Sequence, residues 1–249
     1  MMIEVRDLKR SFGTHCVLDG VSFRIDAGEA VVIMGRSGGG KSVLLKHLVG
    51  LLSPDAGEVL VDGRNIANLG ERQMLEVRSK FGVLFQGAAL FDSLTVAENV
   101  GFALSRSGKC TPAEVANRVA EMLDMVELPG IQDKKPAELS GGMRKRVGLA
   151  RAIVHRPAIV LYDEPTTGLD PVVSDSIDQL ILRVCEQMKV TSIVVTHDMR
   201  SARRIGKRIL YLRDRRIYLD APTEAVFAST DPVVHRFVNG ISIPKEITF

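Results

Sequence analysis

A glycine-rich loop between an apolar strand and a helix constrains the fold of this chain more than any other feature. The loop reads Gly-Arg-Ser-Gly-Gly-Gly-Lys-Ser over residues 35–42. Residues 30–34 before it are all apolar, which is typical of a strand buried on both faces of a parallel sheet, and a helical pattern follows over 41–52. Strand, loop and helix in this order match the pattern of a phosphate-binding loop.

Each part of this loop has a physical reason to hold phosphate. Glycines let the backbone wrap closely, so successive N–H groups point at phosphate oxygens, and the helix N-terminus adds partial positive charge. Lys41 is placed to reach the β- and γ-phosphates, and the Ser42 hydroxyl is placed to ligate Mg²⁺. The alternative, a glycine-rich turn that carries Lys-Ser by coincidence, is disfavoured by the flanking strand and helix. The residues predicted to bind ATP here are Gly35, Arg36, Ser37, Gly38, Gly39, Gly40, Lys41, Ser42 and Val43.

Two adjacent carboxylates follow a second apolar strand, which is predicted over residues 158–162. Asp163 at the strand end is placed to hold the Mg²⁺ shell, and Glu164 beside it to polarise a water for attack on the γ-phosphate. Two acids at a strand end are often only solvated loop residues. Their position after a phosphate-binding loop favours phosphoryl transfer.

A second cradle for an anion is predicted where Ser140, Gly141 and Gly142 precede a helix over 144–153. Spacing alone does not say which phosphate this cradle meets. The alternative, in which Ser140 is only a helix cap with two flexible neighbours, stays open on the sequence.

Strands and helices alternate along the chain, except in its middle third. Residues 96–126 are predicted to be mainly helical, and Thr111, Pro112 and Glu114 form a helix-start signal within them. This pattern predicts an α/β core with a parallel sheet and a helical insert. The other predicted strands lie at 3–6, 21–25, 81–85, 192–196, 208–212 and 216–219, and the other predicted helices at 172–188 and 222–238.

Composition excludes several function classes. The chain carries 33 Lys and Arg against 30 Asp and Glu, and the resulting net charge of +3 gives no electrostatic case for nucleic acid. Three scattered cysteines form neither a metal-site spacing nor a disulfide framework, which favours a reducing compartment. We find no signal peptide and no apolar stretch near the ~20 residues that span a bilayer. The chain is therefore expected to be soluble, and a partner would have to bring it to a membrane.

In their order along the chain, these motifs resemble those of the nucleotide-binding subunit of an ABC transporter, over about residues 3–240. The resemblance implies a P-loop NTPase fold, in which a RecA-like parallel core carries an N-terminal antiparallel β subdomain and an inserted α-helical subdomain. It also implies one nucleotide-binding domain over the whole chain. The implied parts are a catalytic core at 1–86 and 156–240, a helical subdomain at 87–155 and a short tail at 241–249.

The same resemblance assigns roles to further residues. Phe12 would stack on adenine, and Asp170 lies in a loop that contacts nucleotide in this family. His197 is implied to steady the γ-phosphate and the attacking water, which makes Glu164 and His197 the catalytic residues. The implied Mg²⁺ ligands are Ser42, Gln86 and Asp163, and ATP and Mg²⁺ are the implied cofactors.

The resemblance further implies that two copies pair head to tail, with two ATP molecules between them. Ser140 and Gly142 of one copy would then contact the γ-phosphate that Lys41 of the other copy holds. ATP binding would close the dimer, and hydrolysis with product release would reopen it.

The segment at 85–100 is similar to that of ATPases that work with MCE proteins in the Mla-type phospholipid transport systems of Gram-negative envelopes. This similarity implies three partners besides the second copy: a membrane permease, an MCE substrate-binding protein and a small STAS-type accessory subunit. The place of action would be the cytoplasmic face of the inner membrane. Ala88, Ala89, Leu90 and Phe91 are expected to form the apolar floor of a permease groove, unless they pack internally.

Two alternatives stay open. The chain could energise a different ABC importer, such as one for polar amino acids. It could also be a regulatory ABC module without a transport role, like those that act in cell division.

Overall fold

The structure, a computed structural model, describes residues 2–241. Most of the predicted tail, 242–249, lies outside the described residues. The strands are β1 (Ile3–Phe12), β2 (His15–Ile25), β3 (Ala30–Met34), β4 (Ala56–Val61), β5 (Arg64–Asn65), β6 (Phe81–Leu84), β7 (Ile159–Asp163), β8 (Thr191–Val195), β9 (Arg208–Arg213) and β10 (Arg216–Pro222). The helices are α1 (Lys41–Leu48), α2 (Glu71–Arg78), α3 (Val96–Ser107), α4 (Pro112–Met125), the 3₁₀ turn η1 (Pro136–Glu138), α5 (Gly141–Ile153), α6 (Pro171–Met188), α7 (Met199–Ile205), α8 (Thr223–Phe227) and α9 (Pro232–Val238).

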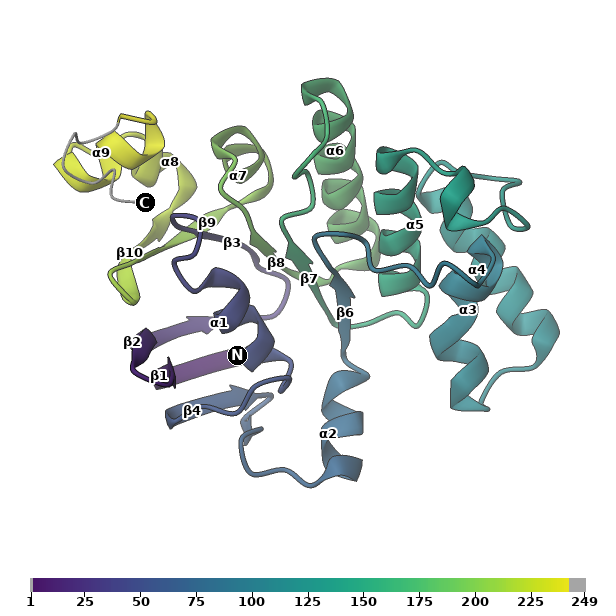
Figure 1. Cartoon of the computed structure of the whole chain (residues 1–249), viewed down its shortest axis with the longest axis horizontal. Coiled ribbons are helices and arrows are strands. Elements are labelled where there is room, and N and C mark those ends of the chain that lie inside the picture. Colours follow the sequence, from purple (N-terminus) through teal and green to yellow (C-terminus); the bar gives the residue numbers. More distant parts are fainter. Residues whose placement is uncertain (1, 242–249) are drawn as a thin grey trace.

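Two sheets organise the chain (Figure 1). The larger sheet has the order β10-β9-β3-β8-β7-β6; all of its strands run parallel except β10, which returns antiparallel beside β9. The smaller sheet has the order β2-β1-β4-β5 and is antiparallel throughout. The predicted α/β fold, with a parallel core and an N-terminal antiparallel sheet, is confirmed.

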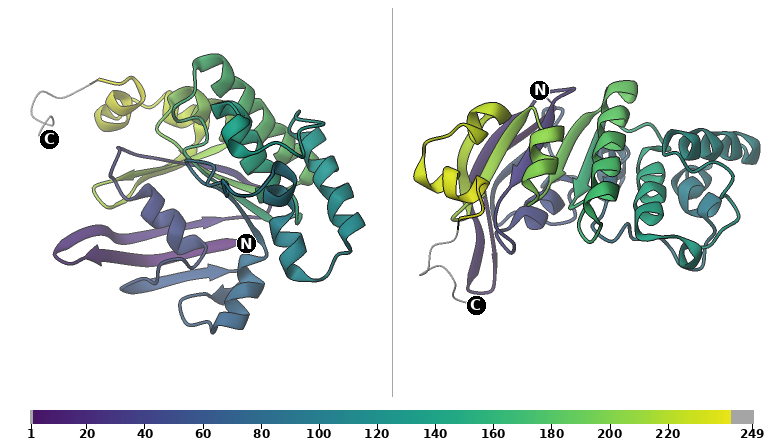
Figure 2. Two further views of the ribbon diagram at one scale, coloured as in Figure 1. Left: turned by 45° about the vertical axis from the view of Figure 1, so that its right-hand side comes forward. Right: turned by 90° about the horizontal axis from the view of Figure 1, so that it is seen from above.

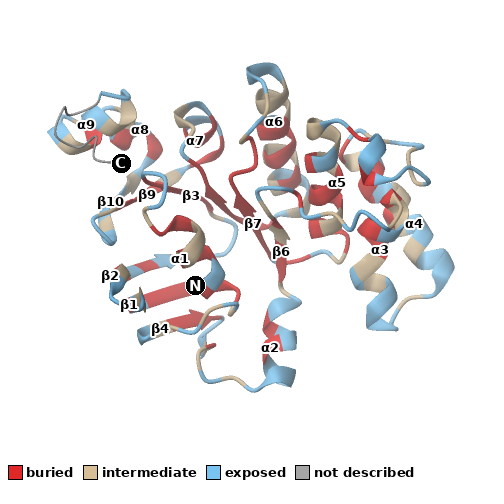
Figure 3. Cartoon of the chain, in the orientation of Figure 1, coloured by how far each residue is buried: buried red, intermediate tan, exposed pale blue. Residues whose placement is uncertain are grey.

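The central strands β3, β7 and β8 are buried along their whole length (Figure 3). Alternate side chains of β3 enter two different cores: Val31 and Ile33 pack with α1 and the antiparallel sheet, whereas Val32 and Met34 pack with α5, α6 and α7. Because both faces are covered, these strands are mainly apolar. The exceptions are Thr191 and Ser192 at the start of β8 and Asp163 at the end of β7, which are polar but buried.

The carboxyl ends of β3, β6, β7 and β8 meet at one edge of the parallel sheet. This edge and the segments that leave it carry Lys41, Ser42, Gln86, Glu164 and His197, for which chemistry was predicted. The first loop ends where α1 begins at Lys41. The predicted extension of α1 to residue 52 is wrong, because the helix ends at Leu48 and Gly50 adopts a left-handed φ of 65°.

The helical insert consists of α3, α4, η1 and α5, which lie together at one end of the molecule (Figure 2). Thr111 caps α4 as predicted: its hydroxyl accepts from the Glu114 N–H, and the Glu114 carboxylate accepts from the Thr111 N–H. The helix α5 packs on α3 and α4 and also on β6, so it joins the insert to the core. The boundaries at 87 and 155 stay a prediction.

Several elements differ from those predicted from the sequence. The helices α2 and α7 and the strands β4 and β5 had no prediction. The single helix predicted over 222–238 is two helices, because Asp231 and Pro232 start a new helix at α9. Within residues 2–241, no helix is long and apolar enough to cross a membrane.

A carboxylate is buried between α6 and α7. Asp178 is only 4% exposed; it is hydrogen-bonded to the Ser201 hydroxyl, while its Oδ1 has no protein partner. Burial raises the pKa of Asp178 from 3.8 to about 6; the Ser201 bond and Arg204 oppose this rise, and Asp198 and Asp175 add to it. The fold therefore favours the protonated acid, and stability falls as the pH rises from about 4 towards 6.

The substitution Asp178→Asn should therefore stabilise the protein above pH 6, because the amide keeps a partner for Ser201 and carries no charge. We expect the free energy of unfolding to rise by about 1–2 kcal/mol at pH 8 and by much less at pH 4.5, as measured by urea denaturation. Glu186→Gln, which changes an exposed carboxylate on the same helix, is the control. A variant that is less stable than the parent at pH 8 would contradict this account.

Candidate functional site

The loop between β3 and α1 has the shape of a phosphate cradle because two of its glycines have no room for a side chain. Gly40, at the N-cap of α1, has a φ of 94°, and a Cβ there would lie 3.0 Å from Val17 Cγ1. A Cβ on Gly35 would lie 2.5 Å from the carbonyl oxygen of Leu212. The backbone therefore runs closely past its neighbours, and the N–H groups at the start of α1 stay accessible.

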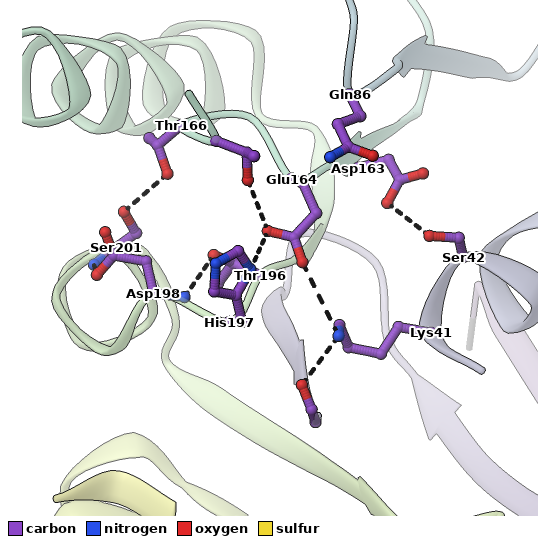
Figure 4. Close-up of polar contacts among 12 residues, drawn as sticks. Lys41, Ser42, Gln86, Asp163, Glu164, Thr166, Thr196, His197, Asp198 and Ser201 are labelled. Carbon is purple, nitrogen blue, oxygen red and sulfur yellow. Dashed lines mark hydrogen bonds and ion pairs between the residues drawn. The ribbon is translucent and has the colours of Figure 1, made fainter. Parts of the chain in front are cut away.

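Lys41 lies inside this loop. Its Nζ donates to the carbonyl oxygens of Gly35 (2.9 Å) and Arg36 (3.0 Å) and lies 3.9 Å from Glu164 Oε1 (Figure 4). Burial lowers the pKa of Lys41, and attraction to Glu164 and Asp163 opposes that effect. A cation is thus held where the loop would bring phosphate oxygens.

The three predicted Mg²⁺ ligands come together. Ser42 Oγ donates to Asp163 Oδ1 over 3.1 Å, and Gln86, which follows the neighbouring strand β6, lies beside Asp163 in Figure 4. Burial raises the pKa of Asp163, and the Ser42 hydrogen bond opposes the rise. A hydroxyl, a carboxylate and an amide are hard oxygen ligands that suit Mg²⁺. Three protein ligands leave places open in the octahedral shell of Mg²⁺, which phosphate oxygens and water would fill.

Glu164 and His197 form the second part of the site. Their side chains meet directly, with Nδ1 of His197 2.8 Å from Oε2 of Glu164. The same oxygen accepts from Thr167 Oγ1 over 3.1 Å, a partner for which the sequence analysis predicted no role. Glu164 has a φ of 51°, a strained conformation for this residue type, which is typical of functional sites. The carboxylate is therefore fixed in one orientation, as a group that polarises water must be.

The predicted signature segment lies elsewhere. The Ser140 hydroxyl accepts from the N–H of Met143 and so caps α5. Gly141 faces Leu169, and Gly142 faces Val173 at the start of α6. Participation of this segment in nucleotide binding therefore requires a second copy and stays a prediction.

Phe12 and Asp170 also lie apart from the catalytic cluster. Phe12 ends β1, is 46% exposed and has the Arg10 guanidinium 4.8 Å from its ring centre. Its exposed ring face is compatible with stacking. The Asp170 carboxylate accepts from the N–H groups of Val172 and Val173 and so caps α6. Both assignments to ATP stay predictions.

This geometry agrees with the comparison with known proteins. The sequence profile of the family described as "ABC transporter" matches residues 18–167. The chain belongs to the ABC transporter family. It is an ATP-binding subunit of that family, and it hydrolyses ATP.

Relatives cover nearly all of this ABC cassette. The protein named "Probable ribonucleotide transport ATP-binding protein mkl" of Mycobacterium leprae is 43% identical over 238 residues, which are 96% of this chain and 69% of that protein. The chloroplastic protein TRIGALACTOSYLDIACYLGLYCEROL 3 of Arabidopsis thaliana is 41% identical, covering 96% and 74%. The methionine import ATP-binding protein MetN of Mesorhizobium japonicum is 40% identical, covering 98% and 67%. The cassette thus spans about two thirds to three quarters of these relatives.

Solved structures share its fold. A dimeric bacterial ABC transporter cassette has a TM-score of 0.82 and 35% identity, covering 89% of this chain and 99% of that one. A dimeric post-hydrolysis state of an ATP-binding cassette, bound to ADP and Pi, has a TM-score of 0.81 and 35% identity with the same coverage.

The contact between Ser42 and Asp163 gives a test of the metal site. Ser42→Ala removes one predicted oxygen ligand of Mg²⁺ and the hydrogen bond to the buried Asp163 carboxylate. We expect the Mg²⁺ concentration for half-maximal ATPase activity to rise roughly tenfold or more, as measured by phosphate release in a Mg²⁺ titration. Ser42→Thr, which keeps the hydroxyl, should behave like the parent. An unchanged Mg²⁺ dependence in Ser42→Ala would exclude the hydroxyl as a ligand.

Proposed function

We propose that this cassette powers phospholipid transport, together with a membrane permease and an MCE protein. Two observations support the proposal: the MCE-like segment at 85–100, and the 41% identity to a relative whose name is that of a glycolipid. A STAS-type subunit is the remaining partner in the proposed complex. The complex would lie at the cytoplasmic face of the inner membrane.

The proposed hydrolysis mechanism uses the clustered residues in distinct roles. Lys41 and the loop N–H groups hold the β- and γ-phosphates, and Ser42, Gln86 and Asp163 hold Mg²⁺, which would neutralise charge on the phosphates. Glu164 accepts a proton from the attacking water. Its hydrogen bonds to His197 and Thr167 support this role, because they fix the carboxylate before the substrate binds.

The proposed active form is a head-to-tail dimer. Ser140 is exposed at the N-terminus of α5, where unpaired N–H groups and the helix dipole favour an anion. Within one copy it caps its own helix and has no contact with the phosphate loop among the described interactions. The solved cassettes at 35% identity are dimeric, which supports a site completed by a partner.

An apolar groove of about 440 Å³ between β6, α3 and α5 is the proposed permease site. Phe91 and Phe102 line it with their ring centres 4.9 Å apart, and the Arg151 guanidinium beside them donates to the backbone oxygens of Ala88 and Ala89. Phe91 is 45% exposed, whereas Ala88 is 1% exposed and packs against α5. The expectation that Ala88 belongs to the groove floor is therefore wrong. The apolar lining suits an amphipathic helix of a permease.

The substitution Glu164→Gln tests the mechanism. The amide keeps the size of the side chain but cannot accept the proton of water. We expect the ATPase rate to fall about 100-fold or more while ATP binding is retained, and a dimer to accumulate with ATP and Mg²⁺. Phosphate release and size-exclusion chromatography measure the two effects. Full turnover in this variant would remove Glu164 from its role.

The substitution Phe91→Asp tests the groove. A charge in the apolar lining should prevent co-purification with the permease, while the ATPase rate of the isolated cassette stays within about twofold of the parent. Leu75→Asp, at an exposed apolar residue on α2, is the control and should keep the permease. Retention of the permease by Phe91→Asp would place the contact elsewhere.

Methionine import is the second candidate function, because the MetN relative is 40% identical over 98% of the chain. The two candidates differ in the complex that the cassette forms. For phospholipid transport, we expect mass spectrometry of the purified complex to detect phospholipid together with an MCE protein. A complex with an amino-acid-binding protein and no phospholipid would favour methionine import.

A further inference from the structure

A buried lysine of the helical insert reaches the catalytic edge of the core. Lys145, in the second turn of α5, is only 5% exposed. Its Nζ donates to the backbone oxygens of Gln86 and of Glu164, the latter over 3.2 Å. One ammonium group therefore joins the insert to the chain segments that follow β6 and β7.

The charges around this lysine support a specific role. Burial of an ammonium group is costly unless acceptors and opposite charges compensate it. Here, burial lowers the pKa of Lys145, and attraction to Asp163 and Glu164 opposes that effect. Lys41 is attracted to the same two carboxylates. Two buried cations, one from the core and one from the insert, thus share a pair of carboxylates.

The surrounding packing leaves little freedom between α5 and the core. A Cβ on Gly148, on the next turn of α5, would lie 2.9 Å from a methyl group of Leu84 and 3.0 Å from Cβ of Ala88. Arg151, one turn further, donates to the backbone oxygens of Ala88 and of the next residue, Ala89. A movement of α5 would therefore move the segment around Gln86, and Lys145 extends the connection to Glu164.

We propose that Lys145 is a positioning residue that ties the helical insert to Gln86 and Glu164. Through its two carbonyl contacts, it fixes the position of Gln86, the Mg²⁺ ligand, relative to Glu164, the proton acceptor. It also passes movements of the permease groove, which includes Phe91 and Arg151, to the site of hydrolysis. The proposal rests on the proposed roles of Gln86 and Glu164.

The test is Lys145→Met, which keeps the length and apolar stem of the side chain but removes its donors and charge. We expect kcat to fall about tenfold, the Mg²⁺ concentration for half-maximal activity to rise at least threefold, and KM for ATP to stay within about twofold. In the complex with the permease, stimulation of the ATPase should be lost. Lys109→Met, at an exposed lysine of the insert, is the matched control and should change none of these values.

The Mg²⁺ dependence and the stimulation by the permease separate positioning from a merely structural role. A Lys145→Met variant with parental Mg²⁺ dependence and parental permease stimulation would overturn the proposal, whatever its thermal stability. If that variant does not fold, Lys145→Gln, which keeps an amide donor, takes its place with the same criteria. Glu164→Gln is measured in parallel. Turnover in Glu164→Gln would refute the proposed mechanism, whereas its loss together with a parental Lys145→Met refutes only the role of Lys145.

Discussion

The site depends on parallel pairing of strands that are buried on both faces. Since β3, β6, β7 and β8 run in the same direction, their carboxyl ends meet at one edge of the sheet. Strand pairing therefore brings residues that lie far apart in the sequence next to one another there, and no long loop is needed to do so. Ser42 and Asp163 share a hydrogen bond, and Glu164 contacts His197, because each is attached to the end of such a strand or to the helix that follows it. The apolar strands are thus the scaffold that sets these distances.

The buried positive and negative charges at this edge of the sheet nearly cancel one another. Lys41 and Lys145 are buried, and so are Asp163 and Glu164. Each of these groups would be costly to bury alone, but together they compensate one another. Because one lysine comes from the phosphate loop and the other from the helical insert, the balance depends on both parts of the chain keeping their places. The phosphate loop and the insert are therefore linked by charge as well as by packing.

Local features could be predicted from the sequence, whereas contacts between distant segments could not. The phosphate loop and the Thr111 cap were found because their signals lie within a few residues. The contact between Glu164 and His197 was not predicted: the family resemblance implied a role for each residue, but nothing in their spacing indicates that they touch. Lys145 was missed because it lies in an Arg-Lys-Arg run, which is typical of a solvated helix face.

The helices and strands that were not predicted from the sequence were missed for similar physical reasons. The helix α7 is short and rich in arginine, so its few buried residues give no clear period. The strand β4 pairs with β1, which is distant in the sequence. The strand β5 pairs with β4 and is only two residues long. In each case, tertiary contacts stabilise an element whose own sequence only weakly favours it. The division into core, insert and tail stays a prediction.

The left-handed backbone of Glu164 has a consequence for the redesign of this protein. Glycine or asparagine would adopt that conformation at a lower cost than glutamate. A procedure that selects residues for backbone compatibility would therefore favour replacing the carboxylate, and the product would fold more readily and catalyse less. If Glu164 has its proposed catalytic role, stability and turnover favour different residues at this position. An engineered thermostable version would then have to keep Glu164 and gain its stability elsewhere.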